Sequence, residues 1–171
     1  MKPKYKPVQD YESDLFSVVY QENRKMFDYP WHYHYEYELT YIPNGQGIRY
    51  VGNSVENFFN DDLVLIGSKV PHCWMYESAD DKNPPNAVVI YLKGNFFDKE
   101  WFQSLEFKAI RNMLQLSEKG IKFNQATVLK LKERCIALVK QDPFQRFISL
   151  MQILNELSEC ADYRLLCEQN F

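Results

Sequence analysis

The chain has 171 residues, a formal net charge of −3 and a hydrophobic fraction of 46%, which suits one domain with a sizeable core. This charge excludes the strongly basic surface of a nucleic-acid-binding domain, and no apolar run is long enough to span a membrane. The N-terminus has no hydrophobic segment of the signal-peptide kind. The four cysteines form no C-x-x-C pair, so reduced thiols in a cytoplasmic protein are expected; they are Cys73, Cys135, Cys160 and Cys167.

Short β-rich segments separated by turn signals fill the first half of the chain. Residues 1–14 are polar with two prolines and are expected to form an arm, which either orders when a ligand binds or simply frays. About eight strands at a spacing of about ten residues predict a closed sandwich or barrel. The expected strands are 15–20, 32–38, 39–42, 48–51, 54–59, 63–66, 72–76 and 87–92.

From residue 95 onward the apolar residues recur at helical spacing, which predicts three helices. Gly120 ends the first helix, Asn124 or Thr127 begins the second, and Asp142 caps the third ahead of Pro143. Three helices carry more apolar surface than they can bury among themselves. A partner surface is therefore expected, most simply a second copy of the chain. The predicted organisation is an arm at 1–14, a barrel at 15–94 and a helical region at 95–171.

Two histidines and two glutamates alternate with aromatic residues in His32-Tyr33-His34-Tyr35-Glu36-Tyr37-Glu38. Because side chains alternate along a strand, the four polar residues share one face. They form either the solvated face of a half-buried strand or a set of metal ligands. A straight strand would hold His34 and Glu38 about 13 Å apart. A shared metal therefore needs a bend between these two residues, or the use of Glu36 instead.

Other side chains suit a small polar ligand inside a barrel. Trp31, Tyr41 and Trp74 could provide aromatic walls, although Trp74 is equally expected in the core. Arg49 could hold a carboxylate or phosphate as a bidentate pair, or could lie on the surface.

Two motifs give the chain a resemblance to known proteins. His32, His34, Glu38 and Gly45 resemble the first conserved motif of the cupin superfamily, and residues 62–72, which end at His72, resemble the second. More narrowly, the chain resembles the effector-binding and dimerisation part of AraC-type transcriptional regulators, over nearly all its length. One departure is Asp61, which replaces the usual glycine before the second motif and predicts a turn without a left-handed residue.

The resemblance implies a double-stranded β-helix (jelly-roll) barrel, followed by an α-helical hairpin that forms a homodimer. It implies a small-molecule effector inside the barrel, and DNA binding only through a C-terminal helix-turn-helix part that this chain lacks. It also implies that His32, His34, Glu38 and His72 hold one divalent transition metal, of which zinc, nickel, iron and manganese suit these donors. Alternatively, the four side chains hydrogen-bond one another or the effector.

These features predict a sensing module of a regulator and no enzymatic activity. The predicted effector-binding residues are His32, His34, Glu38, Tyr41, Arg49, His72 and Trp74, and the predicted effector is a sugar or a related polar metabolite. A metal-dependent cupin enzyme of the dioxygenase or isomerase type is the alternative. A barrel without any ligand, which serves only for dimerisation, is a third hypothesis.

Overall fold

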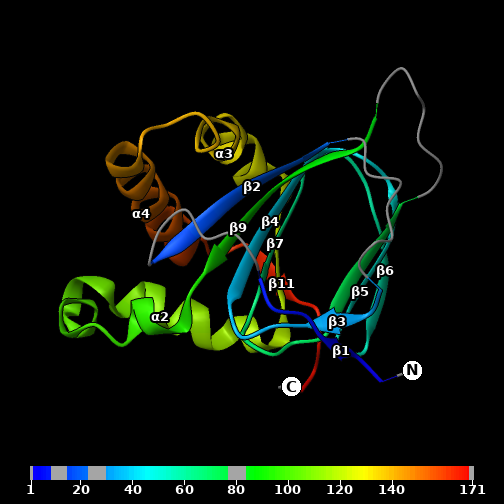
Figure 1. Ribbon diagram of the computed structural model, residues 1–171, viewed down its shortest axis with the longest axis horizontal. Helices are drawn as coiled ribbons and strands as arrows, with labels where there is room; N and C mark the ends of the chain where they lie inside the picture. The colour runs from blue at the N-terminus through cyan, green and yellow to red at the C-terminus, as the bar shows by residue number, and fades with distance from the viewer. Residues whose placement is uncertain (1, 9–14, 23–29, 77–83, 170–171) are drawn as a thin grey trace.

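Two facing β-sheets with helices along one side make up the part of the chain described by the computed structural model, residues 2–8, 15–22, 30–76 and 84–169 (Figure 1). The helices lie against the six-stranded sheet, and the five-stranded sheet stands on the far side of it (Figure 1). Within these described residues, no helix is both long and apolar enough to cross a bilayer. The structure therefore confirms a mainly β chain with helices near its C-terminus.

The five-stranded sheet is antiparallel except at its first edge, where β1 runs parallel to β3. Part of the predicted arm forms β1, while residues 1 and 9–14 lie outside the described residues. In spatial order, the strands are β1 (Lys4–Tyr5), β3 (His32–Tyr33), β8 (His72–Tyr76), β5 (Gly47–Val51) and β6 (Ser54–Phe58).

The six-stranded sheet is antiparallel throughout. Its strands are β11 (Tyr163–Leu165), β10 (Ile121–Phe123), β7 (Asp62–Ile66), β4 (Tyr37–Asn44), β9 (Asn86–Leu92) and β2 (Phe16–Glu22) in spatial order. Every residue of β7 is buried. Leu63 and Leu65 join the core shared with the helices, whereas Val64 and Ile66 join a core cluster with Val51 of the other sheet. Burial on both faces explains why β7 has a continuous apolar sequence.

Two of the predicted helix starts are confirmed by their caps. The Asn124 side chain accepts a hydrogen bond from the Thr127 amide at 2.7 Å, and that of Asp142 accepts from the Phe144 and Gln145 amides, as N-cap residues do. The α-helices are α1 (Gly94–Phe97), α2 (Lys108–Leu116), α3 (Gln125–Ala137) and α4 (Pro143–Glu159), with 3₁₀ turns at Glu100–Gln103, Leu105–Phe107 and Ser117–Lys119.

The region from residue 95 onward is not purely helical, which corrects the prediction. The first expected helix is interrupted because Ser104 is extended, with φ −64° and ψ 164°, and only its last part becomes α2. Strands β10 and β11 add to the six-stranded sheet beside β7. Each has three residues, too few to show the alternation by which a strand is found in a sequence.

The turn before β7 also differs from the prediction. Asp61 has φ 58°, so the turn does use a left-handed residue although no glycine is present. Aspartate enters this region more readily than most residues. The Tyr41 hydroxyl donates to Asp61 Oδ1 at 2.5 Å and fixes the side chain in place.

Gly47 is expected to be required at the pairing of β5 with β8. A Cβ there would lie 1.9 Å from the Met75 carbonyl oxygen, and neither backbone can yield without breaking the ladder. We predict that Gly47→Ala lowers the free energy of unfolding by about 1–3 kcal/mol, measured by chemical denaturation. The control is Gly94→Ala, because nothing lies within 4 Å of a Cβ at that position. Equal stability of the two variants would contradict this prediction.

Candidate functional site

The candidate site is a cluster of three histidines and one glutamate, brought together by a break in the strand. β3 ends at Tyr33 and β4 begins at Tyr37, so the chain bends between His34 and Glu38, as a shared site requires. His34 Nε2 consequently lies 3.0 Å from Glu38 Oε2. Glu38, rather than Glu36, is the carboxylate that faces this imidazole nitrogen at close range.

His72 reaches the same place from a distant part of the sequence. On β8 it pairs directly with His32 on β3. Their ring centroids are 4.4 Å apart, and the rings of His34 and His72 are 4.9 Å apart. Potential ligand nitrogens of His32, His34 and His72 all lie within 4.8 Å of one another, and all three residues are buried. The solvated-face interpretation of the polar alternation is thereby excluded for His32, His34 and Glu38.

Backbone carbonyls orient all three imidazoles in the same way. The Nδ1 atoms of His32, His34 and His72 lie 3.0, 3.1 and 2.8 Å from the carbonyl oxygens of Pro30, Glu36 and Val70. A carbonyl oxygen only accepts, so we assign the proton of each neutral ring to Nδ1. The Nε2 lone pairs of His34 and His72 then face the inside of the cluster, as in histidines that bind metals.

The lone pairs meet a carboxylate that is also an acceptor. His72 Nε2 is buried without a hydrogen-bond partner among the described residues, and it lies 3.3 Å from Glu38 Oε2. Lone pairs that face one another in a buried site repel unless a cation, either a proton or a metal ion, lies between them. Three imidazole nitrogens, with a carboxylate oxygen beside two of them, therefore fit a first-row divalent metal.

Thr40 fixes the carboxylate of Glu38. Its hydroxyl donates to Glu38 Oε1 at 2.6 Å, which leaves Oε2 for His34 and His72. Burial alone would raise the pKa of Glu38, but protonated His72 and His34 beside it outweigh burial and lower the pKa well below its usual range, so a proton held at Nε2 of either ring keeps the carboxylate ionised. Sequence reasoning missed Thr40, although its position two residues after Glu38 places it on the same face of β4.

The other predicted ligand-binding residues are only partly brought to this cluster. Trp74 lies beside the cluster, because its ring centroid is 5.7 Å from that of His72. Its indole Nε1 is buried without an acceptor in the described part of the chain. Arg49 instead pairs with Asp62 and Glu56. Tyr41 does not line the space between the sheets, since odd-numbered residues of β4 face the helices, and it packs in the helical core.

Comparison with known proteins finds solved structures that share this fold. No known family profile matches the sequence, and no curated protein matches it. Among solved structures, the chain is similar to ToxT from Vibrio cholerae strain SCE256 with an unsaturated fatty acid bound, at a TM-score of 0.53 and 14% identity, covering 88% of this chain and 53% of that one. It is also similar to apo ToxT K231A from the same strain, at a TM-score of 0.53 and 15% identity, covering 85% and 54%.

ToxT from Vibrio cholerae O395, bound to (E)-4-(8-methylnaphthalen-1-yl)but-3-enoic acid, gives a TM-score of 0.50 at 16% identity, covering 86% of this chain and 59% of that one. Identities this low show a shared fold, and the chain spans little more than half the length of these ToxT chains. The fold is that of a β-rich module with attached helices, which occurs in ToxT as part of a longer protein.

Burial of His32 is expected to make stability depend on pH. Burial and then the charge of His72 lower its pKa from 6.5 to about 3, so the folded state holds His32 neutral while the unfolded chain protonates it below about pH 6.5. The unfolded state then binds more protons, and the unfolding free energy of metal-free protein falls as the pH drops from 6.5 to 5. The slope approaches about 1.4 kcal/mol per pH unit.

His32→Gln removes this titration, so denaturation at several pH values should give a flatter profile for the variant between pH 6.5 and 5. Parallel profiles for the variant and the wild type would refute the assignment.

Proposed function

We propose that this chain is the effector-sensing and dimerisation domain of an AraC-type transcriptional regulator. The observation that carries the proposal is the shared fold with ToxT, a regulator of that type, over 88% of this chain. On this proposal the two sheets form a cupin jelly-roll barrel and α3 and α4 form the dimerisation hairpin. DNA would be bound through a separate C-terminal part, and the domain itself would catalyse no reaction.

The proposed effector is a small polar molecule, such as a sugar or a related metabolite, held between the sheets. The ToxT structures carry an unsaturated fatty acid and an aryl-butenoic acid, which supports ligand binding by this fold. In this chain the groups around Trp74 include imidazoles and a carboxylate, and its indole N–H has no acceptor among the described residues. These groups favour a ligand that has hydroxyl or carboxylate oxygens over a purely apolar one.

We further propose that His32, His34, Glu38 and His72 hold one divalent transition metal. The support is the shared orientation of the three imidazoles and the acceptor atoms that face one another at Glu38. A bound metal would supply a Lewis-acidic position for an oxygen of the effector. Thr40 would keep one carboxylate oxygen directed at that position.

The same four donors support a second candidate, a metal-dependent cupin enzyme of the dioxygenase or isomerase type. The sequence that the encoding gene carries after codon 171 distinguishes the two candidates. A basic helix-turn-helix segment there supports the regulator, and its absence favours the enzyme or a barrel that serves only for dimerisation.

Exposed apolar residues on the helices support a homodimer. Leu129 and Ile136 on α3 are 50% and 38% exposed, and their spacing of seven residues places them on one face. On α4, Phe144 and Ile148 are also exposed and are four residues apart. Paired apolar stripes of this kind are typical of helices that pack against a second copy.

Metal content tests the metal proposal. Protein purified without a tag from metal-replete medium is expected to contain close to one first-row metal ion per chain, measured by mass spectrometry. His34→Ala should lose it, because three donors remain where four converge. The control is Cys160→Ser, since Cys160 lies outside the cluster and contacts Thr127. Metal-free wild-type protein under these conditions would reject both the metal site and the metal-dependent enzyme.

The proposed dimer is expected to break when charge enters its apolar stripe. We predict that Leu129→Glu with Ile136→Glu yields a monomer, with at least a tenfold weaker dimer (about 1.4 kcal/mol or more), measured by light scattering after size exclusion. Leu105→Glu is the control, because Leu105 is exposed outside α3 and α4. A wild-type monomer, or a dimer that tolerates both glutamates, would contradict dimerisation through α3.

A further inference from the structure

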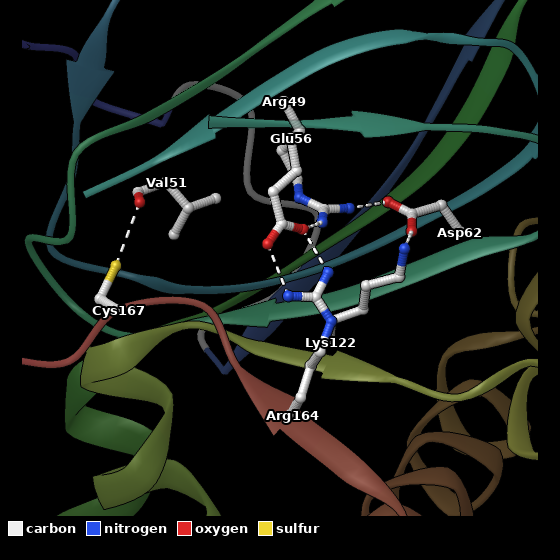
Figure 2. A network of polar contacts seen from close by, with 7 residues as sticks. All are labelled: Arg49, Val51, Glu56, Asp62, Lys122, Arg164 and Cys167. Carbon is white, nitrogen blue, oxygen red and sulfur yellow. Dashed lines mark hydrogen bonds and ion pairs between the residues drawn. The ribbon is translucent and has the colours of Figure 1, made fainter. Parts of the chain in front are cut away.

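The C-terminal strand β11 lies at the edge where the two sheets come together. β11 is the terminal strand of the six-stranded sheet, and β6 is the terminal strand of the five-stranded sheet. Arg164 on β11 donates to both carboxylate oxygens of Glu56 on β6, with Nη1 at 2.5 Å from Oε1 (Figure 2). A bidentate charged pair therefore links these two edges through side chains.

This pair belongs to a chain of alternating charges. Glu56 Oε2 also accepts from Arg49 Nη2 at 3.0 Å, and the second terminal nitrogen of Arg49 donates to Asp62. Lys122 Nζ lies 3.1 Å from Asp62 Oδ1 (Figure 2). Because Arg49 is only 1% exposed, its charge must be neutralised locally. Glu56 is therefore shared between a buried arginine and the more exposed Arg164.

The residues after β11 enter the space between the sheets. Leu166 and Cys167 pack with Val51, Val64 and Ile66. The Leu166 amide donates to the Gly120 carbonyl at 2.9 Å, and the Cys167 thiol donates to the Val51 carbonyl at 3.1 Å (Figure 2). Cys167 is 3% exposed. Its thiol is thus shielded for as long as this segment stays in place.

A cavity adjoins the opposite face of the same strands. Ile121 and Phe123 of β10 and Tyr163 of β11 line a cavity of about 160 Å³ with residues of α2 and α4. Side chains that line a cavity lack the contacts that close packing would give them. The cavity leaves the helix side of the two short strands incompletely filled, although Ile121 and Phe123 are themselves buried in the helical core, and such a packing defect suits an element that opens locally.

Val51 connects this segment to the histidine cluster. It is the register partner of His72 on the neighbouring strand β8, and its carbonyl accepts the Cys167 thiol. A group that immobilises His72 thereby also steadies the acceptor to which Cys167 is bonded.

We propose that β11 with Leu166 and Cys167 is a latch, that the Glu56–Arg164 pair is its catch, and that a ligand on the histidine cluster holds the latch closed. The output of the latch rests on the proposed function, under which the chain beyond it leads to the DNA-binding part. A sensing event between the sheets would then change how that part is tethered, because an effector acts only by favouring one of two states.

Cys167 itself reports the state of the latch. Native protein is treated with iodoacetamide, and the labelling rate of each cysteine is read by peptide mass spectrometry. Arg164→Met and Glu56→Gln are each expected to raise the labelling rate at Cys167 by about fivefold or more. The reason is that loss of the bidentate charged pair lowers the free energy needed to open this segment locally. Cys135, fully buried among the helices, should keep its rate, which separates local opening from unfolding.

The matched control is Arg134→Met, which breaks the 2.7 Å Arg134–Glu156 pair between α3 and α4 and should change the Cys167 rate less than about twofold. The claim that the Glu56–Arg164 pair holds the latch closed is overturned by either of two results. One is a wild-type labelling rate at Cys167 in Arg164→Met, and the other is an equal rise in the labelling rate of Cys135.

The coupling is tested with Zn²⁺ alone. Zinc is expected to slow labelling of Cys167 about threefold or more in the wild type and to leave His34→Ala unchanged. Equal protection in His34→Ala means that zinc binds the thiol directly, and zinc that binds without slowing labelling means that the cluster and latch are independent. Either result overturns the coupling. Zinc that does not bind rejects the proposed metal site together with the coupling, while the Arg164 and Glu56 variants still decide the catch.

Discussion

The convergence of His34 Nε2 and His72 Nε2 on the buried carboxylate of Glu38, with His32 beside them, is the constraint on which the site depends. Each imidazole is held by a backbone carbonyl at Nδ1, so none of the rings can turn to relieve the contact. The cluster is stable only with positive charge at its centre. This requirement explains why a buried group of acceptors can persist in the protein, and it makes the cluster a point where binding and stability are linked.

The space between the sheets therefore contains two polar systems of different character. The histidine cluster brings acceptor atoms of His34, His72 and Glu38 together, whereas the chain from Lys122 to Arg164 neutralises itself through alternating charges (Figure 2). The first system is suited to accept a ligand. The second is suited to hold strands together, and it explains why Arg49, an attractive ligand-binding residue in the sequence, pairs with Asp62 and Glu56 instead.

Much of the site could be predicted because its residues follow simple periodicity. His32, His34 and Glu38 were found from their alternation, and the geometric limit of a straight strand correctly required the bend before β4. Thr40 could have been found by extending the same alternation by one step. Tyr41 was misplaced because alternation tells which residues share a face, but not which face of β4 looks toward the helices.

The sequence by itself determined the β-rich first half, the starts of α3 and α4, and the polar face of the strand with the histidines, because alternation and capping are local properties of neighbouring residues. Only the tertiary structure decided that β10 and β11 join the sheet and that Arg164 meets Glu56, 108 positions away. Such pairings arise from long-range packing, to which a three-residue strand contributes no local signal.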